Sequence, residues 1–438
     1  MADIASDMPE SGSKYFVSKA TMKKSISTVC LGLCLSLVSG AGQVADANSL
    51  RLVAPERLRF VGLDRKLGDA PVKPERKIIR SWQTNPNCPA IKPEEENSVS
   101  GWNKSQREAL VQAVDHSLDY LNTPKATKKY RKYARSKFNL ERTRRSLIRF
   151  KELLLTTESA VALEKVVKQE FDFYQSVGKD KKGRVEFTGY FEPTYTASRV
   201  RTAEYRYPLY RQPASFKRWK RPHPTRAKLE GRDGLGSSNS LLKGSELVWL
   251  SDRLEAFLVQ VQGSARLQMT DGSTMSVGYN GTTSYPYVSV GGELVKDGVF
   301  GKDELTLPRL LEYFEANPQK LDKYIPRNNR FIFFRPTDGK PPTGSLSVPV
   351  TSDRSIATDK SKFPPGALAL IVAPIPEVES SGEVKTRVAS RYVLDQDTGS
   401  AIKGAGRVDI YLGSGDVAGE RAGLLNGSGS LFYLLLKE

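Results

Sequence analysis

The side chains of this 438-residue chain that could do acid–base chemistry are carboxylates in glycine-rich segments. Asp397 opens the run Asp-Thr-Gly-Ser-Ala-Ile-Lys-Gly404, and Asp409 lies in the run Arg407-Val-Asp-Ile-Tyr-Leu-Gly413. A carboxyl group can give a proton to a leaving oxygen and take one from a nucleophile when its pKa lies near the working pH. Both segments therefore offer a candidate general acid or base.

Other kinds of catalytic centre are poorly supported by the residues present. His116 lies on a helical pattern, His223 lies between two prolines, and no Gly-x-Ser-x-Gly motif appears, so we expect no Ser-His-Asp triad. Two of the three cysteines lie in an apolar run near the N-terminus, so a Cys/His zinc cluster is not expected either. No P-loop or Rossmann fingerprint is present. The sequence therefore favours carboxylate chemistry with no metal ion and no cofactor.

Three further polar segments contain glycine and adjoin strand-like runs. They are Phe187-Thr-Gly-Tyr-Phe-Glu-Pro193, Val259-Gln-Val-Gln-Gly-Ser264, and Pro341-Pro-Thr-Gly344 with Ser347-Val-Pro349. Each segment alone has an ordinary explanation, because the ends of strands collect Gly, Asp and Pro. Their order along one chain, together with the two aspartate segments, is more specific than any single one.

The elements that must position these residues are mainly strands. Apolar residues recur at helical spacing from about Lys104 to Tyr174, and the character changes to strands after Gly183. Strands are predicted over 184–196, 257–262, 275–279, 331–335, 367–372, 391–394, 408–412 and 431–436, with a hairpin turn at Asp271-Gly272 between the second and third and a helix over 307–316 capped by Thr306. No alternating strand–helix rhythm and no internal repeat appear. The sequence therefore favours β-barrel-like domains that carry some helix.

The charge and the N-terminus indicate an exported protein with an anionic partner. The net charge of +18 suits nucleic acid, an anionic membrane surface or an acidic wall polymer. Lys23 and Lys24 precede the apolar run 29–38 and the small-residue site Ala45-Asp46-Ala47, which is the pattern of a signal peptide over residues 1–47. The alternative to a signal peptide is an uncleaved membrane anchor. Met22 directly precedes the two lysines, so translation could begin there. Because exported proteins rarely meet nucleic acid, we expect no nucleic-acid partner.

A strongly basic segment follows the first predicted helix. Residues 125–151 contain twelve Lys or Arg residues and one acid, Glu141. This segment is either a solvated helix face or a surface that rests on anionic wall or membrane.

Taken together, these motifs resemble the membrane-bound lytic transglycosylase A (MltA) family, from about Gly183 to the C-terminus. The resemblance also rests on Arg206-Tyr-Pro-Leu-Tyr210, Asn329-Arg-Phe-Ile-Phe-Phe334 and Gly415-Asp-Val-Ala-Gly419. It implies a mainly β fold with some helix, in which a double-psi β-barrel domain carries an inserted second β-barrel domain, with a groove between them. The first barrel would use residues 48–206, after a helical part, and 327–438, and the insert would be 207–326. The last part is a 3D-type segment, whose three aspartates resemble Asp397, Asp409 and Asp416.

The resemblance also implies roles for individual residues. Asp409 matches the catalytic acid of the family and Asp397 matches a neighbouring family aspartate. Contacts to the glycan are implied for Gly189, Tyr190, Glu192, Gln262, Gly263 and Ser264. Lys403 could stabilise negative charge on the substrate or form an ion pair with Asp397. Ser400, Ala265 and the segment 278–287 depart from the common family pattern, which leaves the substrate subsites less defined than the catalytic centre.

The activity implied is cleavage of the bond between N-acetylmuramic acid and N-acetylglucosamine in peptidoglycan glycan strands, without water. One aspartate would protonate the leaving oxygen and then accept the proton of the muramyl C6 hydroxyl, which closes onto C1. A peptidoglycan-hydrolysing muramidase and a non-catalytic glycan-binding wall protein are the alternatives. We expect a monomer that acts in the periplasm or in association with the outer membrane or cell wall.

Overall fold

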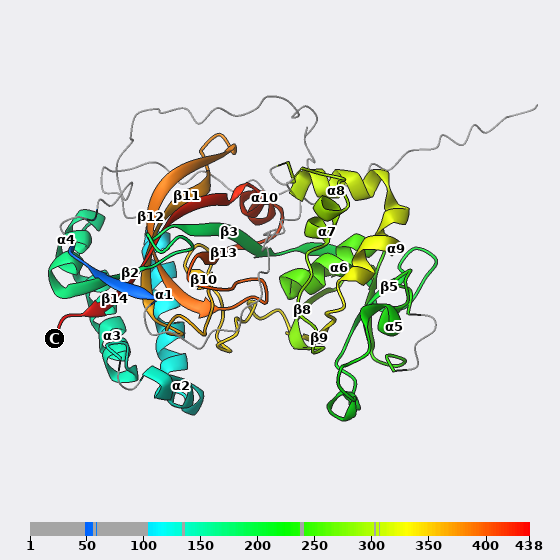
Figure 1. The fold of residues 1–438 in the computed structure, drawn as a ribbon, viewed down its shortest axis with the longest axis horizontal. Coiled ribbons are helices and arrows are strands. Elements are labelled where there is room, and N and C mark those ends of the chain that lie inside the picture. The colour runs from blue at the N-terminus through cyan, green and yellow to red at the C-terminus, as the bar shows by residue number, and fades with distance from the viewer. Residues whose placement is uncertain are drawn as a thin grey trace, which may run out of the picture.

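The computed structural model describes residues 49–55, 58, 104–133, 136–236, 241–301, 304–305 and 307–438. Two β-sheets lie side by side, and most helices pack around their outer sides (Figure 1). The predicted signal peptide 1–47 and the predicted cap Thr306 lie outside the described residues. No helix in the described part of the chain is long and apolar enough to cross a membrane.

The N-terminal part of the described chain forms a layer of helices against the first sheet. The elements are β1 (Leu50–Val53), α1 (Lys104–Leu121), α2 (Pro124–Tyr130), η2 (Arg131–Tyr133), α3 (Leu140–Thr156) and α4 (Ala160–Glu170). Thr123, Asn139 and Ser159 cap α2, α3 and α4, since each side chain accepts a hydrogen bond from a backbone N–H of the first turn. The helical pattern was expected to reach Tyr174, but the helices end at Glu170. From Phe171 onward the chain forms the strand β2 (Phe171–Ser176) instead, in which Phe171, Phe173 and Tyr174 are buried.

The first sheet closes into a six-stranded barrel. The chain contributes β3 (Val185–Glu192), β10 (Ser355–Ala357), β11 (Leu368–Val378), β12 (Val384–Asp397), β13 (Arg407–Ser414) and β14 (Asn426–Leu436). The strand order β14-β11-β12-β10-β13-β3 is closed by a pairing between β14 and β3, while β2 and β1 extend the sheet beyond β14. The helix α10 (Asp416–Leu424) packs on β3 and β13. A mainly β fold with a closed barrel, as predicted, is confirmed.

The second sheet has six strands in the order β5-β6-β4-β7-β8-β9. These strands are β4 (Thr194–Ser198), β5 (Tyr207–Tyr210), β6 (Glu246–Leu250), β7 (Ser264–Met269), β8 (Thr274–Thr282) and β9 (Ile332–Pro336). A bridge between Arg211 and Phe334 joins the two outermost strands, so this sheet also curls toward closure. The sheet takes in β4 and β9, which lie just outside the range 207–326 predicted for the insert.

Short helices cover the second sheet. They are η3 (Phe216–Arg218), α5 (Arg226–Glu230), α6 (Arg253–Gln262), α7 (Val290–Lys296), α8 (Leu307–Ala316), η4 (Pro318–Lys320), α9 (Leu321–Tyr324) and η5 (Ile325–Arg327). The helix predicted over 307–316 is confirmed, whereas the strand predicted over 257–262 is wrong because these residues belong to α6. Asp252 caps α6 and Gly263 ends it with a left-handed φ of 86°. The helix is buried on most sides, so its apolar run reads like a buried strand.

The two sheets are joined by one nearly continuous stretch of chain. β3 runs from the barrel toward the second sheet, and only Pro193 separates it from β4 (Figure 1). Buried side chains of both sheets, among them Phe187, Phe191, Tyr195 and Leu267, belong to one hydrophobic cluster. The junction of β3 and β4 is therefore packed as part of a core, and this packing fixes where the end of β3 lies.

Candidate active site

Asp409 lies in the middle of β13, inside the barrel sheet. β13 pairs with β3 in parallel, with Asp409 opposite Thr188, and with β10 in antiparallel, with Asp409 opposite Ala357. A strand held on both sides leaves its side chains little freedom to move. Burial raises the pKa of the Asp409 carboxyl above its ordinary value, and the charge of Asp397 adds to the rise, while Arg407 and Thr188 oppose it. A raised pKa is what a carboxyl group needs to act as an acid near neutral pH.

A short chain of hydrogen bonds fixes which oxygen of Asp409 carries a proton. Arg407 Nη2 donates to Thr188 Oγ1 at 2.8 Å, and Thr188 Oγ1 donates to Asp409 Oδ1. A threonine hydroxyl has one hydrogen, and here that hydrogen is directed at Oδ1 while the oxygen accepts from Arg407. Oδ1 is therefore the accepting oxygen of Asp409, and Oδ2 is the position for a transferable proton.

Asp397 lies at the end of β12, held by three donors. Its Oδ1 accepts from the backbone N–H groups of Ser345 and Thr398, both at 2.8 Å, and its Oδ2 accepts from the Tyr190 hydroxyl at 2.9 Å. Burial raises the pKa of Asp397, and these hydrogen bonds and the charge of Lys360 oppose the rise. These three contacts tie the carboxyl group to the loops around it.

Tyr190 connects Asp397 to the strand that carries Asp409. Its ring lies 5.2 Å from the ring of Tyr411, measured between centroids, and Tyr411 is two residues beyond Asp409 on β13. Tyr190 therefore contacts Asp397 through its hydroxyl and β13 through its ring, and it links the positions of the two aspartates.

Gly189 is required for close packing of α10 on β3. A Cβ atom at this position would lie 2.8 Å from Ala422 Cα and 2.8 Å from Leu412 Cδ1, closer than real Cβ atoms approach other atoms. This packing explains the glycine without a ligand, and a contact between Gly189 and the glycan stays a prediction.

Glu192 ties the two sheets together at the end of β3. Its buried Oε2 accepts from Arg266 Nε of β7 at 2.8 Å and from Ser414 Oγ at the end of β13 at 2.7 Å. Its backbone oxygen accepts from Gly415 N at 2.9 Å. Glu192, predicted from the family pattern to bind substrate, thus has its Oε2 engaged in structural contacts.

Gln262, Gly263 and Ser264 form the turn from α6 into β7. Gln262 Oε1 lies 3.4 Å from Phe191 N, so this turn borders β3 three residues beyond Thr188. Gly263 allows the sharp turn through its positive φ, and Ser264 begins β7. The structure therefore brings the Gln-Gly-Ser turn of the second sheet next to the strand that positions Asp409.

Lys403 is exposed in the loop that follows Asp397. In the described part of the chain it forms no ion pair, so the pairing with Asp397, one of the two roles considered for it, is not formed. The loop is held instead by Asp359, whose Oδ2 accepts from Gly404 N at 2.8 Å. Burial opposes a low pKa of Asp359, but hydrogen bonds from Ser361 and Gly404 and the charge of Lys403 together lower it.

Sequence reasoning missed three residues that build this site: Thr188, Arg407 and Ser345. Thr188 and Arg407 stood inside two of the singled-out motifs, and Ser345 follows the Pro-Pro-Thr-Gly motif directly. Their roles depend on pairing between strands far apart in the chain, which a motif does not reveal.

Comparisons with known proteins show the family of this chain. The family model described as the MltA specific insert domain matches residues 186–335, and the model of the 3D domain matches residues 354–435. The membrane-bound lytic murein transglycosylase A of Escherichia coli is 31% identical over 265 residues, which are 60% of this chain and 69% of that protein. This chain belongs to the MltA family. The Vibrio cholerae member is 30% identical over 60% of this chain and 68% of its own length.

The fold agrees with that of solved MltA structures. The crystal structure of Escherichia coli MltA with bound chitohexaose superimposes on this chain with a TM-score of 0.59 and 24% sequence identity. The match covers 78% of this chain and 92% of the Escherichia coli chain. In the present MltA family member, both matched models meet at the site: Thr188, Tyr190 and Gln262 come from the insert-domain match, and Asp397 and Asp409 come from the 3D-domain match.

Proposed function

We propose that this chain is a lytic transglycosylase that cleaves peptidoglycan glycan strands, with Asp409 as its single acid and base. Membership of the MltA family supports the reaction, since the curated relatives are lytic murein transglycosylases. The observation that carries the residue assignment is that one oxygen of the Asp409 carboxyl group accepts a hydrogen bond from the protein while the other is left for proton transfer. Its pKa is raised, Oδ1 accepts from Thr188, and Oδ2 remains as the oxygen that can hold and release a proton.

The reaction balances with one carboxyl group. Protonated Asp409 gives its proton to the oxygen between C1 of N-acetylmuramic acid and N-acetylglucosamine, and the C1–O bond breaks. The resulting carboxylate accepts the proton of the C6 hydroxyl of the same muramyl residue, whose oxygen bonds to C1. The product is a 1,6-anhydro ring, and Asp409 is protonated again. Attack within one sugar has a large entropic advantage over attack by a separate water molecule.

The surroundings of Asp397 favour this reaction over hydrolysis by a muramidase. A hydrolase of the usual kind needs a second carboxylate as nucleophile or as the base that activates water. Asp397 is the carboxyl group whose charge acts on Asp409, and both of its oxygens accept hydrogen bonds from protein donors. These hydrogen bonds stabilise its carboxylate and oppose the rise in its pKa, so they make it a weaker base or nucleophile than a carboxylate without such donors.

Digestion of purified sacculi in water labelled with heavy oxygen tests the reaction. A transglycosylase forms anhydromuramyl products that contain no oxygen from the solvent, and mass spectrometry detects this directly. A hydrolase places one labelled oxygen at each new reducing end, which would contradict the proposal. A protein that binds sacculi but releases no soluble fragments would support the non-catalytic alternative.

We also propose that the enzyme is exported to the periplasm and contacts anionic wall or membrane through part of its basic segment. Several basic side chains of α3 are engaged within the fold: Arg142 with Asp172, Arg144 with Glu141, Arg149 with Glu152 and Glu170, and Lys151 with Asp115. By contrast, Lys128, Lys129 and Arg131 of α2 and η2 are exposed and form no ion pair among the described residues. Together with the exposed Arg145 of α3, they belong to the part of the segment that can meet an anionic surface.

Charge reversal tests whether binding depends on these three residues or on the net charge of the protein. Replacing Lys128, Lys129 and Arg131 by Glu should weaken co-sedimentation with sacculi or anionic vesicles at low salt, where screening is weak. Replacing Lys217, Arg218 and Lys220, exposed beside the second sheet, makes the same change in net charge and serves as the control. Lys132 is left intact because its Nζ donates to Lys360 O at 2.7 Å and thus supports the fold. Equal loss of binding in both triple variants would exclude a localised surface.

A further inference from the structure

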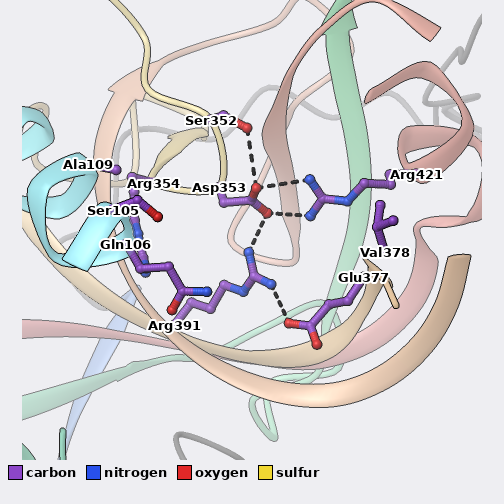
Figure 2. A pocket seen from close by; sticks show the side chains of 10 residues that line it. All are labelled: Ser105, Gln106, Ala109, Ser352, Asp353, Arg354, Glu377, Val378, Arg391 and Arg421. Carbon is purple, nitrogen blue, oxygen red and sulfur yellow. Dashed lines mark hydrogen bonds and ion pairs between the residues drawn. The ribbon is translucent and has the colours of Figure 1, made fainter. Parts of the chain in front are cut away.

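A polar cavity lies on the barrel, lined by residues that the proposed reaction does not use. It has a volume of about 410 Å³, within the range of small-ligand sites. Its walls come from the start of α1, the loop before β10, the outer parts of β11 and β12, and α10 (Figure 2). Five charged residues line it: Asp353, Arg354, Glu377, Arg391 and Arg421. Three guanidinium groups thus face two carboxylates.

Asp353 is fully engaged with two of the three arginines. Arg421 makes a two-pronged contact, with Nη1 to Oδ2 at 2.9 Å and Nη2 to Oδ1 at 2.6 Å, and Arg391 also donates to Oδ1 (Figure 2). Arg391 reaches Glu377 Oε1 as well, at 2.5 Å. These contacts account for both carboxylates and for Arg391 and Arg421. The charge of the third arginine, Arg354, is not matched by either of these carboxylates.

Arg354 is the cation without a matching carboxylate. In the described part of the chain it forms no ion pair, and its side chain donates one hydrogen bond, from Nη1 to Tyr392 O at 3.3 Å. Among the side chains drawn in Figure 2, no interaction line reaches it. Burial and the positive charge of Arg391 lower the pKa of Arg354 to about 10, and Asp353 offsets this only in part. A guanidinium in this state is stabilised by any anion that reaches it.

The backbone beside Arg354 is held in an uncommon conformation. Asp353 has a φ of 61°, in the left-handed region that residues other than glycine seldom adopt. It is kept there by its arginine contacts and by a bond from its N–H to Tyr411 O at 2.7 Å. Strain of this kind persists where the surrounding structure enforces it, and it is concentrated at ligand sites.

We propose that this cavity binds an oxyanion, a carboxylate or a phosphate, through the guanidinium of Arg354. The planar fork of arginine matches both groups, and the fixed network around Asp353 prevents Arg391 and Arg421 from collapsing into the space. The site is separate from the acid–base centre and does not depend on the proposed reaction. Two sources carry this chemistry: inorganic phosphate, and the carboxylates of the peptides attached to peptidoglycan glycan strands.

Calorimetric titration of the intact protein tests the site. The probes are inorganic phosphate and, separately, a short acetylated peptide with two free carboxylates. Wild-type protein should bind at least one probe with a single site. R354Q should bind it at least about tenfold more weakly, the loss expected when a charged hydrogen bond is removed. R201Q removes the same charge from an exposed loop after β4 and should bind like wild type.

The outcomes separate the two sources. Binding of the peptide alone assigns the site to a carboxylate ligand, and binding of phosphate alone assigns it to the free ion. If both probes bind and compete, the shared oxyanion chemistry is supported. R354K, which keeps the charge and loses the fork, provides a second variant if R354Q does not fold. No binding to wild type, or equal binding to wild type and R354Q, overturns the proposal, and neither result bears on the acid–base role of Asp409.

Discussion

Thr188 donates its hydroxyl hydrogen to Asp409 Oδ1 across the parallel pairing of β3 and β13. Arg407, two residues before Asp409 on the same strand, donates to the same hydroxyl oxygen. The relationship gives Asp409 two different oxygens, one occupied by a neutral donor and one available for proton transfer. It also gives the site a hydroxyl whose removal would change the surroundings of the Asp409 carboxyl without removing that carboxyl.

Thr188→Val should move the alkaline limb of the activity profile to higher pH. The hydrogen bond from Thr188 stabilises the carboxylate and opposes the rise in the pKa of Asp409, so its loss raises that pKa further. The acid form then persists to higher pH, although kcat should fall by about tenfold because the carboxyl is less well oriented. The measurement is kcat/KM on sacculi against pH. Thr188→Ser keeps the hydroxyl and should retain the wild-type limb, and an unchanged limb in Thr188→Val would contradict the hydrogen bond's role.

Asp409→Asn should lose at least about 100-fold in rate, the usual scale for general acid–base catalysis. The amide keeps the size of the side chain and can still accept from Thr188, but it cannot give up a proton as a carboxylic acid does. Release of soluble anhydromuropeptides from sacculi measures the loss. Circular dichroism should show an unchanged fold. Full activity in this variant would exclude Asp409 as the catalytic acid.

The same variant should become more stable than wild type as the pH rises. Asp409 has a pKa raised in the folded state, so its contribution to stability is present below the unfolded pKa, about 3.9, and is lost as the pH rises through the folded pKa. Asparagine does not titrate. The difference in Tm between Asp409→Asn and wild type should therefore increase from about pH 4 toward neutrality, which thermal melts across this range would measure. A constant difference would mean that burial does not raise the pKa of Asp409.

Tyr190→Phe should lower activity by about tenfold or more through Asp397. The variant removes the donor to Asp397 Oδ2, a hydrogen bond of the charged kind worth about 1.5–3 kcal/mol. Tyr411→Phe is the matched control, since its ring packs against Tyr190 while its hydroxyl contacts Ser414 Oγ, at 3.3 Å, and not Asp397. Activity on sacculi should separate the two variants. Similar activities would assign Tyr190 to packing alone.

Glu192→Ala should destabilise the junction of the two sheets by about 1–3 kcal/mol, because Ser414 and Arg266 lose a buried acceptor. Half of the Arg266 side chain is exposed, at 52%, so water can replace part of the loss. Urea unfolding measures the change. Arg199→Ala removes an exposed ion pair with Asp271 in the same sheet and should cost less than about 1 kcal/mol. Equal losses in the two variants would contradict the bridging role of Glu192.

The sequence by itself determined the class of fold, the family and the two central aspartates. Runs rich in β-branched and aromatic residues predicted most strands of the barrel, because such side chains pack well in strands. The motifs around Asp397 and Asp409 could be recognised in the sequence, since a turn or a strand end is built from residues that are neighbours along the chain. Local patterns failed at 257–262, where α6 is buried on nearly all sides and loses the polar face that marks a helix.

Only the tertiary structure decided what each motif residue does. Thr188 and Asp409 are 221 positions apart, and Tyr190 and Asp397 are 207 apart, so these pairs arise from the register between strands and not from spacing along the chain. Strand pairing also explains why two motif residues differ in their surroundings. Glu192 is buried and bridges the sheets, whereas Lys403, in the loop after Asp397, remains exposed. Local sequence fixes which groups are available, while strand pairing and burial fix their partners and hence their protonation.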